Sequence, residues 1–159
     1  MLTFKEANTE QDYVTASKLF TEYVQQLGVD LSFQNFNDEL DTLSVMYAKP
    51  YGVLILAWEK DVPIGCFGIR KLENSICELK RMYIREEWRG FGYGKQLIKK
   101  AIELAARHGY SKMRLDTLST MTSAIKLYSQ VGFYEIEPYR FNPMAGAKYF
   151  EIGLHRLET

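Results

Sequence analysis

The chain has 159 residues, of which 20 are lysine or arginine and 20 are aspartate or glutamate, so its formal net charge at pH 7 is zero. This balance creates no overall field that would attract nucleic acid or an anionic membrane, and we expect neither as a partner. A chain of this length is expected to form a single domain over residues 1–159 and to bury about two-thirds of the surface that it exposes when unfolded.

The first half of the chain is predicted to form two helices and four strands. Apolar residues at helical spacing predict a helix over 12–27 that ends before Gly28, and a second helix is predicted over 33–43. A hairpin turn over 60–63 joins two of the predicted strands. The predicted strands are residues 3–7, 52–58, 64–71 and 77–84.

The second half alternates between helices and strands. The predicted helices are 93–107 and 122–131, each with an apolar stripe at i, i+3, i+4 spacing and a glycine near its end. The predicted strands are 112–117, 133–136 and 148–157. The pattern predicts an α/β fold, with a mixed and mostly antiparallel sheet of about six to seven strands and helices on both faces.

Cysteine, histidine and the apolar runs indicate no metal site, disulfide or membrane span. Cys66 and Cys77 lie in predicted strands and are expected to be small buried apolar residues. His108 and His155 are isolated, without the spacing of metal ligands. The longest apolar run, residues 53–58, is too short to cross a bilayer, and no basic cluster followed by an apolar stretch opens the chain. We therefore expect a cytoplasmic protein.

A glycine-rich loop between a strand and a helix has the composition of an anion site. Gly90, Gly92 and Gly94 alternate there, and without Cβ atoms the backbone can approach a ligand closely. The first N–H groups of the helix have no partner within it and can donate to a phosphate. A P-loop would need glycine where Arg89 stands, and a dinucleotide fingerprint would need glycine where Lys95 stands.

Two motifs in this order resemble the signatures of the GNAT superfamily of N-acetyltransferases. The first is Arg-x-x-Gly-x-Gly at Arg89, Gly92 and Gly94, which is similar to the acyl-CoA-binding signature of that family. The second is A-x-x-L-Y-x-x-x-G-F over residues 124–133. The resemblance covers roughly residues 50–157, and the order of elements is also that of the family. It implies an enzyme that moves an acetyl group from acetyl-CoA to a primary amine.

The resemblance also implies a set of residues that bind acetyl-CoA as a co-substrate. The backbone of one strand would pair with the pantetheine amides, helped by a bulge that splays this strand from its neighbour. The loop and the first helical turn would then donate to the pyrophosphate. The implied residues are Met82, Tyr83, Ile84, Arg89, Gly90, Phe91, Gly92, Tyr93, Gly94 and Lys95. The Arg89 side chain can instead fix the loop, and Lys95 can be an ordinary solvated lysine.

One position departs from the family pattern. Many members have asparagine three residues before the alanine of the second signature, where its side chain bonds to the cofactor, and this chain has Met121. Ser119 or Thr120 are candidates to replace that hydrogen bond.

Two residues are implied to carry the chemistry. Tyr128 matches the tyrosine that protonates the leaving thiolate in many relatives, although it can also be a core tyrosine. Glu78 is the candidate general base, and a water is the alternative base. Glu78 can also be an ordinary surface carboxylate of a half-exposed strand, without a catalytic role. Because no cysteine lies on a motif position, we expect direct transfer without a covalent intermediate.

The acceptor is expected to enter opposite CoA, between the N-terminal helices and the loop over residues 137–147. Arg81, Tyr139, Arg140 and Asn142 are the candidate substrate-binding residues, and an arginine can bind a carboxylate with two hydrogen bonds. The sequence favours a small-molecule amine, including one that carries a carboxylate. A protein lysine or N-terminus, a longer acyl-CoA donor, a homodimer and a non-catalytic acyl-CoA-binding module all stay open.

Overall fold

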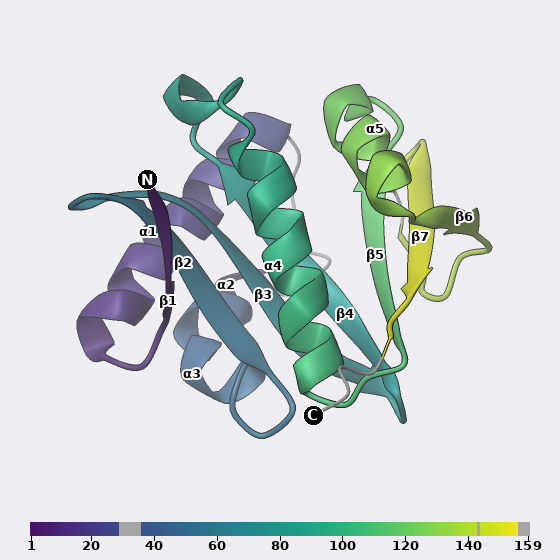
Figure 1. The fold of residues 1–159 in the computed structure, drawn as a ribbon, viewed down its shortest axis with the longest axis horizontal. Helices are drawn as coiled ribbons and strands as arrows, with labels where there is room; N and C mark the ends of the chain where they lie inside the picture. The colour runs from purple at the N-terminus through teal and green to yellow at the C-terminus, as the bar shows by residue number, and fades with distance from the viewer. Residues whose placement is uncertain (29–35, 143, 156–159) are drawn as a thin grey trace.

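The computed structural model describes residues 1–28, 36–142 and 144–155. They form one seven-stranded sheet in the order β1-β2-β3-β4-β5-β7-β6, in which β4 and β5 run parallel and the other neighbouring pairs run antiparallel (Figure 1). The strands are β1 (Leu2–Glu6), β2 (Val53–Glu59), β3 (Val62–Glu73), β4 (Ile76–Ile84), β5 (Lys112–Leu118), β6 (Tyr134–Ile136) and β7 (Ala147–Gly153). The predicted mixed, mostly antiparallel sheet is confirmed.

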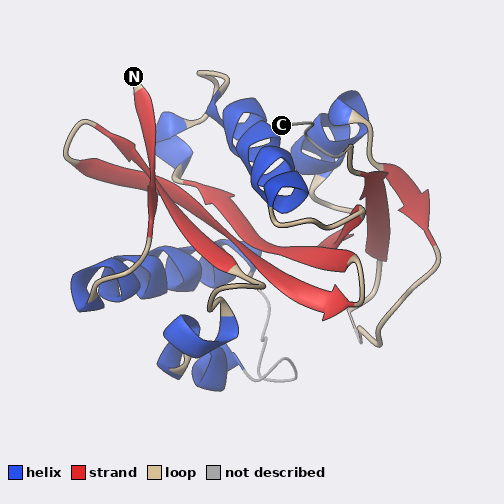
Figure 2. Cartoon of the chain, turned by 60° about the horizontal axis from the view of Figure 1, so that its bottom comes forward, coloured by secondary structure: helices blue, strands red, loops and turns tan. Residues whose placement is uncertain are grey.

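Helices cover both faces of this sheet, as predicted, and Figure 2 shows the two layers on either side of the strands. The helices α4 and α5 lie on one face, and α1, α2 and α3 lie on the other. Their bounds are α1 (Glu10–Leu27), α2 (Phe36–Asp41), α3 (Leu43–Met46), the 3-10 helix η2 (Glu86–Trp88), α4 (Tyr93–Arg107) and α5 (Thr122–Val131). Within the described part of the chain, no helix is long and apolar enough to cross a membrane.

Local sequence signals set the ends of the long helices. Thr9 and Asp12 form a capping box at the start of α1, and Gly28 ends that helix in the left-handed conformation. Both ends of α5 are as predicted, since Gly132 stops it with φ 114°. In α4, the apolar stripe predicted from the sequence is buried against the sheet.

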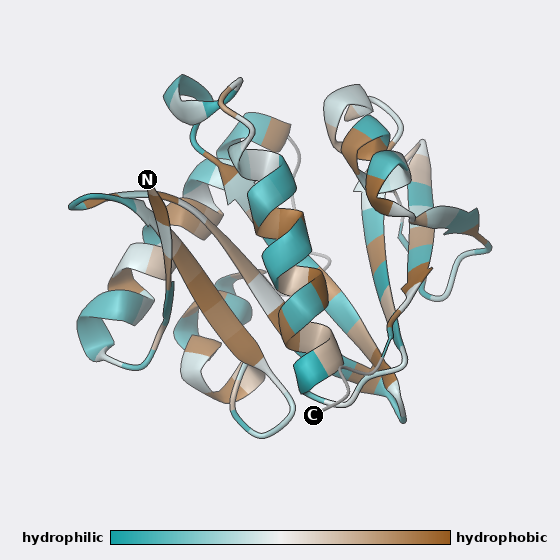
Figure 3. Cartoon of the chain, viewed as in Figure 1, coloured by the Kyte–Doolittle hydropathy of each residue, from teal (hydrophilic) through white to brown (hydrophobic). Residues whose placement is uncertain are grey.

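The sheet separates two apolar cores, because successive side chains of a strand point to opposite faces. On β2, Ile55 and Ala57 pack with the α4 side, and Leu54 and Leu56 pack with the α1 side. Figure 3 shows β2 as a hydrophobic ribbon, as expected for a strand that is covered on both faces. Cys66 and Cys77 are free and fully buried in the two cores, which confirms their predicted packing role.

The strands β4 and β5 diverge soon after they begin to pair. Their register covers Ile76–Glu78 of β4, and Glu78 with Arg114 is the last pair (Figure 1). Further along β4, the register with β3 shifts between Cys66 and Gly68, and Arg81 has φ 56°. This extra residue on β4 is the bulge expected from the family resemblance, and it turns the end of the strand away from β5.

Most predicted ends differ from the structure by no more than two residues, and two elements depart further. The helix predicted over 33–43 is described from Phe36, ends at Asp41 and is followed by the separate short helix α3, whereas residues 33–35, with Phe33, lie outside the described residues. The final strand was predicted to run to 157 but ends at Gly153. The N–H of Leu154 donates to the carbonyl of Ser111, just beyond the last β5–β7 pair of Lys112 and Gly153. Residues 156 and 157 also lie outside the described residues.

Candidate active site

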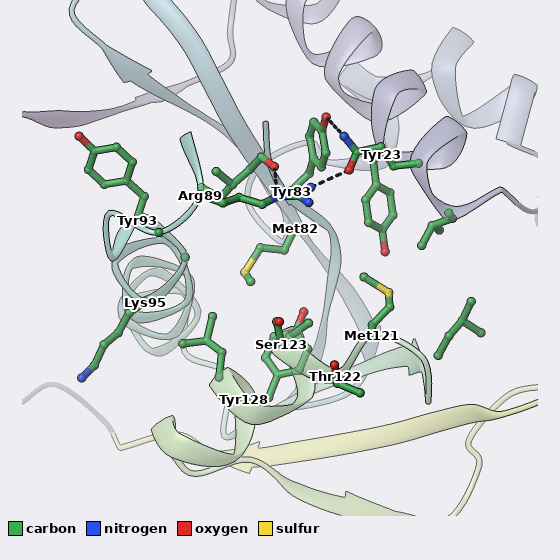
Figure 4. Close-up of a pocket in the computed structure, with 18 of the residues that line it drawn as sticks. Tyr23, Met82, Tyr83, Arg89, Tyr93, Lys95, Met121, Thr122, Ser123 and Tyr128 are labelled. Atoms are coloured by element: carbon green, nitrogen blue, oxygen red, sulfur yellow. Dashed lines mark hydrogen bonds between the residues drawn. The ribbon is translucent and has the colours of Figure 1, made fainter. Parts of the chain in front are cut away.

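A pocket of about 740 Å³ opens where β4 and β5 diverge (Figure 4). Four elements surround it: the end of β4, the glycine loop with the start of α4, the start of α5, and the last turns of α1. Of the ten residues predicted to bind acetyl-CoA, nine line this pocket: Met82, Tyr83, Ile84, Arg89, Gly90, Gly92, Tyr93, Gly94 and Lys95. The tenth, Phe91, is not among the lining residues, and its side chain is exposed and stacked on Tyr93.

The glycine loop has a backbone shape that other residues rarely adopt. Gly90 has φ 89° and Gly92, the N-cap of α4, has φ 80°. A Cβ at either position would meet no atom within 4 Å. Glycine is therefore favoured there by the backbone conformation and not by a lack of space. The first hydrogen bond of α4 runs from the N–H of Gln96 to the carbonyl of Gly92. The preceding N–H groups therefore stay available to an anion at the positive end of the helix dipole.

The Arg89 side chain anchors this loop to the rest of the site. It donates to the carbonyl of Ile84 at 2.9 Å and to the side chain of Gln26 in α1 at 2.6 Å (Figure 4). These bonds match the predicted role of fixing the loop. Figure 4 also shows the side chains of Tyr93 and Lys95 pointing away from the pocket, so these two residues contribute backbone to it.

Tyr128 lines the pocket from α5 and keeps its hydroxyl group free. The residue is 7% exposed, and its ring packs against Phe133 and Phe150. Within the described residues its hydroxyl has no hydrogen-bond partner. Burial raises the pKa of Tyr128 above its ordinary value, and the neighbouring Tyr23 raises it further. The group is therefore a neutral proton donor at physiological pH.

Glu78 lies outside the pocket lining, on the face of the sheet that α1 and α2 cover. It is fully buried, and its Oε2 accepts hydrogen bonds from Tyr139, at 2.8 Å, and from Arg140. Arg70 forms an ion pair with its Oε1 at 3.2 Å. The structure thus brings three predicted site residues together, but as a cluster that ties the loop between β6 and β7 to the sheet.

The other predicted acceptor residues bind protein partners. Arg81 donates to both carboxylate oxygens of Glu39, at 2.8 and 3.1 Å. Asn142 donates to Asp116 at 3.4 Å and accepts from the N–H of Met144 at 2.9 Å. Neither residue lines the pocket described above. Within the described residues, no group of three or more His, Cys, Asp or Glu side chains could hold a metal ion.

Sequence reasoning missed the contribution of α1 to the site. Tyr23, Gln26 and Leu27 line the pocket, and Figure 4 shows the Tyr23 hydroxyl pointing into it. The apolar stripe of α1 was visible in the sequence, but helical spacing does not say which residues of a stripe reach beyond the core. At the departure from the family pattern, Met121 and Thr120 line the pocket. The N–H of Ser119 donates to the carbonyl of Gly146.

The comparisons with known proteins agree with this geometry. A model of the acetyltransferase (GNAT) family matches residues 16–133. An uncharacterized N-acetyltransferase of Schizosaccharomyces pombe is 37% identical over 148 residues, covering 92% of this chain and 91% of its own. Human N-acetylaspartate synthetase is 32% identical over 91 residues, covering 53% of this chain and 30% of its own. A Salmonella typhimurium protein described as an acetyltransferase, solved with its cofactor acetyl-CoA, superposes with a TM-score of 0.77 at 16% identity, covering 100% of this chain and 97% of its own.

Proposed function

The chain belongs to the GNAT family of N-acetyltransferases, and on that premise we propose that it transfers the acetyl group of acetyl-CoA directly to the primary amine of a small molecule. One observation carries the proposal. The free hydroxyl of Tyr128 lies in a pocket that also contains the N-terminus of α4 and the end of β4. Release of CoA thiol from acetyl-CoA in the presence of an amine tests the transfer.

The shape of the pocket supports acetyl-CoA as the donor. Beyond Glu78, β4 has no pairing with β5, so the backbone of Met82 to Ile84 can bind an extended chain of amides as an added strand. At the other end, the N–H groups at the start of α4 suit a pyrophosphate. The thioester would then lie between these two parts, beside Tyr128.

The loop geometry makes a testable prediction for donor binding. Gly92→Ala is expected to weaken acetyl-CoA binding by about 5- to 30-fold, because a left-handed conformation costs an alanine about 1–2 kcal/mol and the loop would relax away from it. Gly109→Ala is the matched control, since Gly109 follows α4 at its other end with φ 87° and also has no atom within 4 Å of a Cβ. Isothermal titration should show weaker binding for the first variant only. Equal affinities of the two variants for acetyl-CoA would contradict the role of the glycine loop in binding the donor.

The mechanism needs a proton donor at the sulfur and a proton acceptor at the amine. When the C–S bond of the tetrahedral intermediate breaks, the thiolate can take its proton from the Tyr128 hydroxyl. Burial supports this role, because it keeps Tyr128 protonated until a stronger base appears beside it. The amine must lose its proton before or during its attack on the carbonyl carbon.

We propose that water accepts the amine proton and that Glu78 positions the site. Glu78 is 0% exposed and is held by two arginines and a tyrosine. Its partners surround the carboxylate, and a path for protons from it to the pocket would have to pass them. Its bonds to Tyr139 and Arg140 fix the loop between β6 and β7, which borders the expected acceptor entrance.

The pH dependence of a Glu78→Gln variant separates the two roles. For a positioning residue, we expect kcat/KM for the amine to fall by a similar factor at every pH from 6 to 9. If Glu78 is the general base, the variant should instead lose most activity below the pKa of the amine, where the wild type depends on removal of the amine proton. The KM for acetyl-CoA is expected to stay unchanged and serves as the check that the variant is folded. A loss of kcat/KM at low pH alone would contradict the positioning role and identify Glu78 as the general base.

A small amine that carries a carboxylate is the acceptor class that we propose. A human relative supports it, since the protein that is 32% identical to this chain over 91 residues is N-acetylaspartate synthetase.

A further inference from the structure

Four cations and two carboxylates are gathered on the α2-covered side of β3 and β4. The cations are Arg70, Lys80, Arg81 and Arg140, and the carboxylates are Glu39 and Glu78. Charges in a protein interior are normally paired, because an isolated charge loses its hydration. Because the cluster has more cations than carboxylates, we looked for a cation without an ion pair.

Lys80 is the cation of this cluster that forms no ion pair among the described residues. Arg81 binds both oxygens of Glu39, and Glu78 is shared by Arg70 and Arg140. Lys80 is 8% exposed, yet it has no hydrogen bond or ion pair within the described part of the chain. A third carboxylate on this side, Asp116, accepts a hydrogen bond from Asn142.

The neighbouring groups are also incompletely satisfied. The Nε of Arg140 is buried without a hydrogen-bond partner, and so is Oε1 of Glu78, which faces Arg70 at 3.2 Å. Burial, with the charge of Arg81, lowers the pKa of the Lys80 ammonium to about 8, although Glu78 and Glu39 act to raise it. A structural role explains none of this, because an apolar residue of the same size would avoid the cost of burying the charge.

The position of Lys80 suggests what completes the cluster. Lys80 stands two residues before Met82, the first β4 residue of the pocket lining, and two residues after Glu78, where β4 and β5 separate. The charges of Glu39 on α2 and of Arg140 on the β6–β7 loop both act on its pKa, which Glu39 raises and Arg140 lowers. A ligand between α2 and this loop would reach the ammonium from the face of the sheet that α1 and α2 cover.

We propose that Lys80 and Arg140 bind the carboxylate of the acceptor amine. The inference rests on the proposed acetyl transfer and adds the substrate class to it. An acceptor carboxylate would supply the missing negative charge and accept hydrogen bonds from the Lys80 ammonium and the free Arg140 Nε. Its amine would then point toward the split between the strands. The carboxylate takes no part in bond making.

Binding is tested without turnover by using CoA, which cannot react. Each proteinogenic L-amino acid is compared with its own α-carboxamide, and the melting temperature of the protein is read in saturating CoA. At least one amino acid should raise the melting temperature while its carboxamide does not. Lys80→Met should abolish this shift, and Lys99→Met, an exposed lysine on α4, should retain it. The subsite is wrong if no acid exceeds its amide or if Lys80→Met keeps the shift.

Kinetics and stability give a second, independent reading. Lys80→Met should raise the KM of the carboxylate-bearing acceptor at least about 10-fold, as expected for a lost charge-assisted hydrogen bond, and leave the KM of acetyl-CoA unchanged. The melting temperature of ligand-free Lys80→Met should equal or exceed that of the wild type, whereas a fall would mark a structural lysine and overturn the proposal. Turnover of amines without any carboxylate preference would also overturn it and leave acetyl transfer standing. Carboxylate-dependent binding with no CoA release would support the subsite and count against the proposed transfer.

Discussion

Tyr128→Phe is expected to lower kcat for acetyl transfer by about 100-fold or more, while the KM for acetyl-CoA changes by less than about 2-fold. The variant keeps the buried ring and its contacts with Phe133 and Phe150 and loses only the hydroxyl. Since that hydroxyl has no partner among the described residues, its removal leaves no group of the fold unsatisfied. A large loss of kcat would therefore report chemistry and not packing.

Tyr110→Phe is the matched control for this prediction. Tyr110 is 6% exposed, and its hydroxyl donates to the carbonyl of Tyr51 at 2.5 Å, away from the lining of the pocket. We expect this variant to lose about 1 kcal/mol of stability and to keep its kcat. An unchanged kcat for Tyr128→Phe, or equal losses in both variants, would remove Tyr128 from the role of acid.

Glu39→Gln is expected to reduce the free energy of unfolding at pH 7 by about 3 kcal/mol or more. Glu39 is 3% exposed and binds Arg81 through both carboxylate oxygens, and it also accepts a hydrogen bond from Tyr47. Removing one partner of a buried ion pair takes away the counter-charge of the other, which typically costs about 3–5 kcal/mol. Urea unfolding measures the change. Asp41→Asn, an exposed position on the same helix, is the control and should stay within about 0.5 kcal/mol of the wild type.

The same pair predicts a dependence on pH. Burial by itself raises the pKa of Glu39, but the hydrogen bonds and the charge of Arg81 outweigh burial and hold the pKa below its ordinary value. A carboxyl group with a lowered folded-state pKa stabilises the fold above its unfolded pKa of about 4.3, and this stability is lost as the pH falls through the folded value. The stability difference between wild type and Glu39→Gln should shrink below about pH 4. A constant difference down to pH 3 would show that the ionised pair is not its source.

The sequence predicted the parts of the fold that local signals determine. The ends of α4 and α5 match the structure because each helix combines an apolar stripe with a glycine stop, and nine of the ten predicted acetyl-CoA residues line one pocket. The break between α2 and α3 and the 3-10 helix η2 were missed, since no glycine or proline marks them. The end of β7 was missed because it depends on the partner strand β5, which begins at Lys112 opposite Gly153.

The acceptor side could not be read from the sequence, because long-range pairings define it. Glu78 is bound by Tyr139 and Arg140, which lie 61 and 62 residues away, and Arg81 is bound by Glu39, 42 residues away. No local pattern connects such residues. Lys80 could not be recognised for a related reason. The alternation of a strand predicts which face of the sheet a residue lies on, but not which charges on that face form ion pairs.

Release of free CoA thiol from acetyl-CoA is the most direct test of acetyl transfer. Purified protein is incubated with acetyl-CoA and one amine pool at a time: amino acids, polyamines, aminoglycosides or lysine-containing peptides. We predict thiol release that depends on the amino acid pool and on the hydroxyl of Tyr128, with an acetylated amine of matching mass as the second product. Release with the peptide pool alone would contradict the small-molecule acceptor. No release with any pool, although acetyl-CoA raises the melting temperature, would contradict catalysis and leave a protein that binds acetyl-CoA without using it.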